Sequence, residues 1–107
     1  MTLDPPCVIQ PRGADLILTG EIDLHNVAVI ESHILPWLHD GDNHLDLSGV
    51  EFMDSTGLTL ILRVHAMAIR RGARLHITCS PVVYTVLSMA GLLESFPALT
   101  VTRAEGR

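Results

Sequence analysis

Short apolar runs typical of β-strands alternate along this chain with longer stretches of helical periodicity. The strand-like runs occupy residues 7–10, 14–19, 44–47 with an extension through 52–53, 74–79 and 99–101. The helical patterns occupy residues 27–37, 56–71 and 81–90. Strands alternating with helices indicate parallel, right-handed crossovers. We predict an α/β fold of order β-β-α-β-α-β-α-β. Its mixed sheet has about five strands with an antiparallel opening hairpin, and three or four helices cover mainly one face.

Local signals predict where the elements begin and end. Asn26 is placed to cap the first helix, Pro36 should weaken its last turn and Gly41 should end it. The pair at residues 48–49, Ser-Gly, follows the strand over residues 44–47, and residues 52–53 extend that strand. Ser80, followed by a proline, is typical of a helix N-cap.

The central helix carries an apolar stripe that we expect to face the core. Its members are Leu58, Ile61, Leu62, His65 and Ile69. His65, like His33 on the first helix, is more simply interpreted as a partly exposed helix residue than as a ligand.

Composition and charge limit the class of protein. At 107 residues and 48% hydrophobic content, the chain has room for one domain and is too apolar to be disordered. Residues 1–54 hold ten acids and one arginine, a balance of −9, whereas residues 55–107 have a balance of +4. An acidic half argues against nucleic-acid binding and suits a partner with a basic surface. A solvated acidic face without a partner is the alternative.

The sequence favours a cytoplasmic protein. The longest apolar stretch, residues 58–69, is broken by Arg63 and His65, and a spanning helix needs about 18 uninterrupted apolar residues. Residues 1–10 lack the pattern of a secretory signal. The only cysteines, Cys7 and Cys79, are expected to be reduced, small apolar residues.

The most informative stretch is Asp54-Ser55-Thr56-Gly57, which joins a strand to the central helix. Gly57 costs about 1 kcal/mol in a helix relative to alanine, and should leave the backbone uncovered beside the two hydroxyls. A hydroxyl at a helix N-terminus lies among free N–H groups, where a phosphate is accommodated. The plainer interpretation is a cluster of capping residues.

No pattern for catalysis, metal binding or nucleotide binding is present. The chain has no G-x-S-x-G elbow, no H-E-x-x-H, no Cys/His spacing typical of zinc, no P-loop and no G-x-G-x-x-G. We therefore expect no catalytic residues, no metal and no cofactor.

Three stretches in register resemble one family. Gly-Glu-Ile-Asp at 20–23, Phe-Met-Asp-Ser-Thr-Gly-Leu at 52–58 and Met-Ala-Gly-Leu at 89–92 are similar to signatures of the anti-sigma factor antagonists, which are single STAS domains. The similarity covers residues 16–101. It implies one STAS domain over residues 1–107, with a core at about 7–101 and a frayed tail at 102–107. Thr59 stands where the family often has glycine, and the short tail lacks room for a final helix.

The resemblance implies a bacterial partner-switching regulator of transcription. In the family, the unphosphorylated domain binds an anti-sigma factor that is also a serine kinase and so releases the sigma factor. Phosphorylation ends binding, and a phosphatase restores it. Carried onto this chain, the acceptor is Ser55, with Thr56 as second choice, and Asp23 should lie near Ser55. The residues implied in partner binding are Glu21, Asp23, Asp54, Ser55, Thr56 and Gly57. We expect a monomer or weak dimer that binds neither nucleic acid nor membrane.

Two other functions remain open at this point. A STAS domain can be a non-switching scaffold or a subunit of a larger assembly, such as a stress-sensing complex or a lipid transporter. A phosphate-transfer enzyme is the weakest option, because no acid/base pair supports it.

Overall fold

The predicted element order is confirmed by a computed structural model, which describes residues 6–92 and 99–104. One sheet has the strand order β1-β2-β3-β4-β5; the β1–β2 pair is antiparallel and the other pairs are parallel. The strands are β1 (Cys7–Arg12), β2 (Asp15–Ile22), β3 (Gly41–Met53), β4 (Ala73–Cys79) and β5 (Leu99–Arg103). The helices are α1 (Val27–Trp37), α2 (Ser55–Arg70) and α3 (Pro81–Met89).

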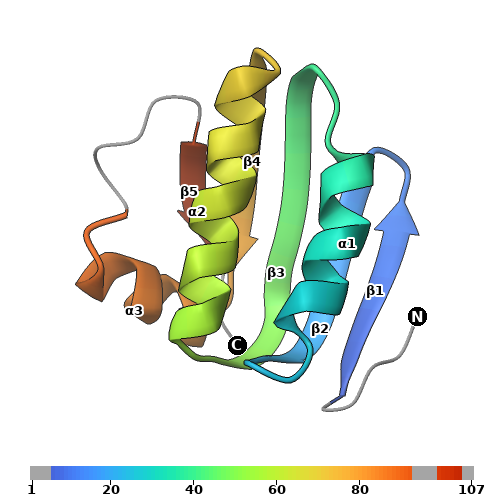
Figure 1. The fold of residues 1–107 in the computed structure, drawn as a ribbon. Helices are drawn as coiled ribbons and strands as arrows, with labels where there is room; N and C mark the ends of the chain where they lie inside the picture. The colour runs from blue at the N-terminus through green and yellow to red at the C-terminus, as the bar shows by residue number, and fades with distance from the viewer. Residues whose placement is uncertain (1–5, 93–98, 105–107) are drawn as a thin grey trace.

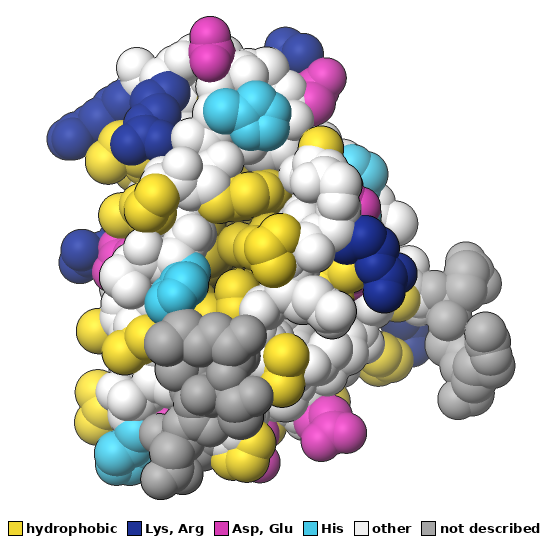
Figure 2. Space-filling model, turned by 90° about the vertical axis from the view of Figure 1, so that its right-hand side faces the viewer, with side chains coloured by type: hydrophobic (Ala, Val, Ile, Leu, Met, Phe, Trp, Pro, Cys, Tyr) yellow, Lys and Arg dark blue, Asp and Glu magenta, His cyan; other side chains and the backbone are white. Residues whose placement is uncertain are grey.

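The helices cover one face of this sheet (Figure 1). Side chains of a strand alternate between its two faces, and the buried ones therefore mark the covered face. Leu45 and Leu47 are buried while Asp46 between them is not, and β4 alternates in the same way from Ala73 to Cys79. Viewed from the β1 side, hydrophobic side chains gather at the centre of the surface and charged ones stand mainly around it (Figure 2).

Strand β3 runs without a break from Gly41 to Met53, across the Ser-Gly pair at residues 48–49. Gly49 lies against Thr19 of β2, and a Cβ added at Gly49 would stand 2.5 Å from the Thr19 methyl carbon. Gly20 has a similar role in β2, where its φ is 109° and an added Cβ would stand 2.3 Å from the carbonyl oxygen of Pro6. Both glycines permit close approach inside strands, and neither ends one.

The predicted ends of α1 also need correction. Asn26 occupies the N-cap position but makes no side-chain capping hydrogen bond. The helix ends at Trp37, directly after Pro36, and Gly41 is instead the first residue of β3. By contrast, Ser80 caps α3 as predicted, accepting a hydrogen bond from the Val83 N–H at 3.3 Å.

The core face of α2 differs from the predicted stripe. Ile61 is buried as expected, but Leu62 and Ile69 are 37% and 49% exposed. His65 is only 5% exposed, so the interpretation of this residue as partly exposed was wrong. The buried positions are Gly57, Leu60, Ile61, Val64, His65 and Ala68. Large apolar residues occur on all sides of this helix, so residue type alone does not identify the buried face. The buried face is set by helical spacing, and it includes small residues and a histidine.

No helix among the described residues is long and apolar enough to cross a membrane. Both cysteines lie in the core as free thiols. Of the predicted frayed tail, residues 102 and 103 belong to β5, and residues 105–107 lie outside the described residues.

Candidate functional site

Two loops meet where β2 and β3 end. The strands run parallel with Ile22 opposite Met53, so the residues that follow each strand emerge side by side. The backbone N–H of Asp54 donates to the carbonyl oxygen of Ile22 at 3.2 Å and joins the two loops. We call the surface formed by residues 21–26 and 52–57 the Asp54 edge. It holds three acidic residues and no arginine.

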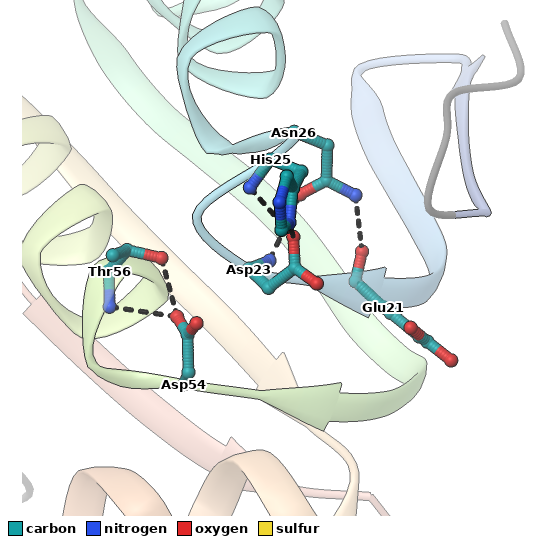
Figure 3. A network of polar contacts seen from close by, with 6 residues as sticks. All are labelled: Glu21, Asp23, His25, Asn26, Asp54 and Thr56. Atoms are coloured by element: carbon teal, nitrogen blue, oxygen red, sulfur yellow. Dashed lines mark hydrogen bonds and ion pairs between the residues drawn. The ribbon is translucent and has the colours of Figure 1, made fainter.

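Asp54 caps α2 with its side chain. Its carboxylate accepts hydrogen bonds from the Thr56 backbone N–H at 2.9 Å and from the Thr56 hydroxyl at 2.5 Å (Figure 3). Burial acts to raise the pKa of Asp54, but hydrogen bonds outweigh it and hold that pKa below its ordinary value. The donors are the Thr56 hydroxyl and the backbone N–H groups of Thr56, Gly57 and Leu24. The Leu24 contact ties the α2 cap to the neighbouring loop.

Ser55 is the first residue of α2, and it is exposed. Among the described residues, its hydroxyl makes no hydrogen bond, whereas its carbonyl oxygen accepts one from the Thr59 hydroxyl at 3.2 Å. Thr56 is half-buried and its hydroxyl is engaged by Asp54. Of the two candidate acceptors, Ser55 therefore has the more accessible hydroxyl.

Gly57 does not leave the backbone uncovered, as its sequence context had indicated. It is buried, and an added Cβ would stand 2.3 Å from the Cγ of Met53 and 3.2 Å from the Cγ2 of Ile22. Glycine is thus required by the side chains that pack against the first turn, and the Ser55 turn rests directly on the core.

The neighbouring loop is held by its own polar side chains (Figure 3). Asp23 accepts a hydrogen bond from the His25 backbone N–H at 2.9 Å. Asn26, only 1% exposed, accepts from the Asp23 N–H at 3.0 Å and donates to the Glu21 carbonyl oxygen at 2.9 Å. The Glu21 side chain extends away from Asp54 in this view. The structure therefore brings the Asp23 loop beside Asp54, and directs the Glu21 carboxylate elsewhere.

Two apolar residues of the Asp54 edge were missed by sequence reasoning. Leu24 is 69% exposed in the loop, and Phe52 is 48% exposed near the end of β3. Alternation along β3 was a usable signal for Phe52, since it precedes the buried Met53. An exposed leucine and an exposed phenylalanine on the same edge as Asp23 and Asp54 provide apolar contact area among polar residues.

The described part of the chain contains no group of three or more His, Cys, Asp or Glu side chains arranged to hold a metal ion. The Asp54 edge thus offers hydroxyls, carboxylates and apolar side chains. This chemistry suits binding and modification.

Comparison with known proteins decides the family. A sequence model of the STAS domain matches residues 7–105. The chain belongs to the STAS domain family. Relatives of this STAS domain include the anti-sigma-B factor antagonist of Staphylococcus aureus strain NCTC 8325, 33% identical over 64 residues, and that of Staphylococcus epidermidis, 31% identical over 64 residues. Each alignment covers 58% of this chain and 59% of the relative's length.

Solved structures agree on the fold. An anti-sigma factor antagonist from Mycobacterium paratuberculosis has a TM-score of 0.71 at 20% identity, over 94% of this STAS domain and 90% of that chain. The anti-sigma factor antagonist SpoIIAA in its unphosphorylated form has a TM-score of 0.66 at 20% identity, over 90% of this chain and 87% of that one. The five-stranded mixed sheet is thus the fold expected from the family resemblance.

Proposed function

We propose that this STAS domain is an anti-sigma factor antagonist switched by phosphorylation of Ser55. The unphosphorylated form binds an anti-sigma factor that is also a serine kinase, and thereby frees a sigma factor. A phosphatase reverses the modification. The names of the curated relatives support the antagonist role. The observation that carries the switch is an exposed serine at the first position of α2, beside the capping carboxylate of Asp54.

Electrostatics explain how such a switch works. A phosphate on Ser55 adds about −1.5 to −2 charges at pH 7. Asp54 already occupies the capping position and accepts from the Thr56 N–H, so the added phosphate stands beside an existing anion. The Asp54 edge supplies no arginine to neutralise it. Repulsion and the cost of removing water from the phosphate both oppose docking.

The test compares the native domain with Ser55→Ala and Ser55→Asp. Tagged forms capture proteins from a lysate of the encoding organism, and mass spectrometry identifies them. We expect native protein and Ser55→Ala to capture an anti-sigma factor with serine kinase activity. Ser55→Asp should bind it about 100-fold more weakly, a difference of about 2.7 kcal/mol. Calorimetric titration of the captured partner measures the affinities.

A thermal melt separates binding from folding. A carboxylate near a helix N-terminus is favourable, so Ser55→Asp should melt close to the native protein. Equal affinity of the native domain and Ser55→Asp for the partner contradicts the repulsion mechanism. Early melting of both variants identifies Ser55 as a structural residue only.

Phosphopeptide mapping after incubation with the captured kinase checks the acceptor. We expect label on Ser55, because the Thr56 hydroxyl is held by Asp54. Label that persists in Ser55→Ala and vanishes in Thr56→Ala assigns Thr56 instead. Capture of a larger STAS-containing assembly, with no labelling of either hydroxyl, favours the non-switching scaffold.

A further inference from the structure

A hollow of about 420 Å³ lies between α1 and α2, next to the Asp54 edge. Val27 and Ala28 line it from α1, and Thr56, Thr59 and Leu60 line it from α2. Small side chains explain the hollow: alanine and two threonines leave the space that larger residues at this helix pair would fill. Most of its lining surface is apolar.

An ion pair bridges the two helices at the hollow. Glu31 of α1 and Arg63 of α2 both line it, with 2.7 Å between the Glu31 carboxylate oxygen and the Arg63 Nε. The Glu31 side chain is 19% exposed and Arg63 is 65% exposed. Because Glu31 already has its cation, the hollow itself favours an uncharged occupant.

The hollow is continuous with the Ser55 turn. Thr56 lines the hollow and also binds the Asp54 carboxylate. Thr59 lines it too, and donates to the Ser55 carbonyl oxygen at 3.2 Å. A group seated in the hollow therefore lies one helical turn or less from the proposed phosphoacceptor. A chain segment leaving it toward the Asp54 edge meets the carboxylates of Asp23 and Asp54, and this edge contains no arginine.

We infer that the α1–α2 hollow receives an aliphatic side chain of the anti-sigma partner, and that a basic residue neighbours this side chain on the partner. The inference rests on the proposed function, and specifies which contact determines partner choice. Apolar walls select the aliphatic group, and the acidic edge selects the adjacent cation. A phosphate on Ser55 then stands beside a seated partner segment.

Filling the hollow from this side tests the inference. Ala28→Leu occupies the space from α1, and Thr59→Leu occupies it from α2. The matched control is Ala66→Leu, since Ala66 is exposed on α2 and does not line the hollow. Burying one aliphatic side chain corresponds to about 10- to 100-fold in affinity. Titration of the captured kinase should show a loss of that size for the two filling variants and less than about 3-fold for the control.

A thermal melt of each variant shows that it is folded. If one of the two filling variants unfolds, the affinity of the other variant for the kinase tests the inference. A native-like Kd for a folded filling variant overturns the inference. It leaves the proposed function intact, because native protein still binds tightly and Ser55→Asp still binds weakly. Capture of no anti-sigma factor by the native domain overturns both.

Cross-linking identifies the occupant. Both native thiols are buried, so Ala28→Cys introduces an accessible thiol for a short photo-crosslinker, with Ala66→Cys as control. The partner peptide joined to position 28 should contain an aliphatic residue next to an arginine or lysine. A peptide without this pair, or equal yields at positions 28 and 66, contradicts the assignment.

Discussion

At the residue scale, single atoms decide what the first turn of α2 tolerates. Position 57 has no room for a Cβ, because Met53 and Ile22 pack against it. Helix propensity alone favours alanine over glycine there by about 1 kcal/mol. Packing opposes that preference, and Gly57 therefore has a structural reason to be glycine.

We expect Gly57→Ala to lower the free energy of unfolding by about 1–3 kcal/mol, as overpacked core positions do. Urea denaturation of the two proteins measures the change. A double-mutant cycle with Met53→Ala should show strong coupling, since the contact that opposes the new methyl group is then removed. A gain of stability in Gly57→Ala means that Met53 moves aside easily and that the helix propensity of alanine outweighs the cost of packing.

Asp54 gives the domain a predictable response to acid. Its folded pKa lies below the ordinary value, so its carboxylate contributes stability above about pH 4, the unfolded value. That contribution is lost as the pH falls through the folded pKa. Asp54→Asn retains a capping oxygen but does not titrate. Urea unfolding from pH 7 to pH 2.5 should show the native protein's advantage over Asp54→Asn shrinking with acid. A constant difference across this range means that the charge is irrelevant to the cap.

At the element scale, an arginine that follows α2 supplies hydrogen bonds to the C-terminal end of α1. The Arg71 guanidinium, just after α2, donates from Nη1 to the carbonyl oxygens of Leu35 at 3.1 Å and Leu38 at 2.9 Å. These carbonyls belong to the C-terminal turn of α1, where Pro36 stops the helix and carbonyl groups lack helical donors. The arginine that follows α2 therefore completes the end of α1.

Replacing Arg71 with alanine should lower the free energy of unfolding by about 1–2 kcal/mol, because charge-assisted hydrogen bonds are lost. Arg70→Ala is the matched control: it removes the preceding exposed arginine and should change stability by less than about 0.5 kcal/mol. Equal effects of the two substitutions, measured by urea denaturation, contradict the capping role.

At the scale of the whole molecule, one core encloses both thiols. Cys7 lies on edge strand β1 and Cys79 at the end of β4, yet both are inaccessible. Burial raises the pKa of Cys7 to about 11 and the pKa of Cys79 to about 12. Thiolate, the reactive form, is therefore suppressed in the folded protein at neutral pH.

We expect a thiol reagent at pH 8 to react slowly with the native domain and rapidly in urea, with both thiols appearing in one transition. Stability should also fall as the pH rises above about 9 toward 11–12, because the unfolded thiols ionise first. Early reaction of Cys7 alone, before the global transition, means that β1 opens independently of the core.

Much of the molecule was predictable from local pattern. Strand and helix periodicity predicted the element order, and the Asp54–Gly57 stretch pointed to the candidate site. Capping by Ser80 was predictable because its partner is three residues away. The three separated motifs also pointed to the family, since their residues stand in register along the chain.

Only the tertiary structure decided features that depend on residues distant in sequence. Position 49 needs glycine because Thr19 packs against it, and Gly57 looked open until Met53 and Ile22 covered it. The hollow between α1 and α2 exists because two helices face each other with small side chains. Local hydrogen-bonding and periodicity act over a few residues and can be seen in the sequence, whereas packing depends on which surfaces meet after the chain has folded.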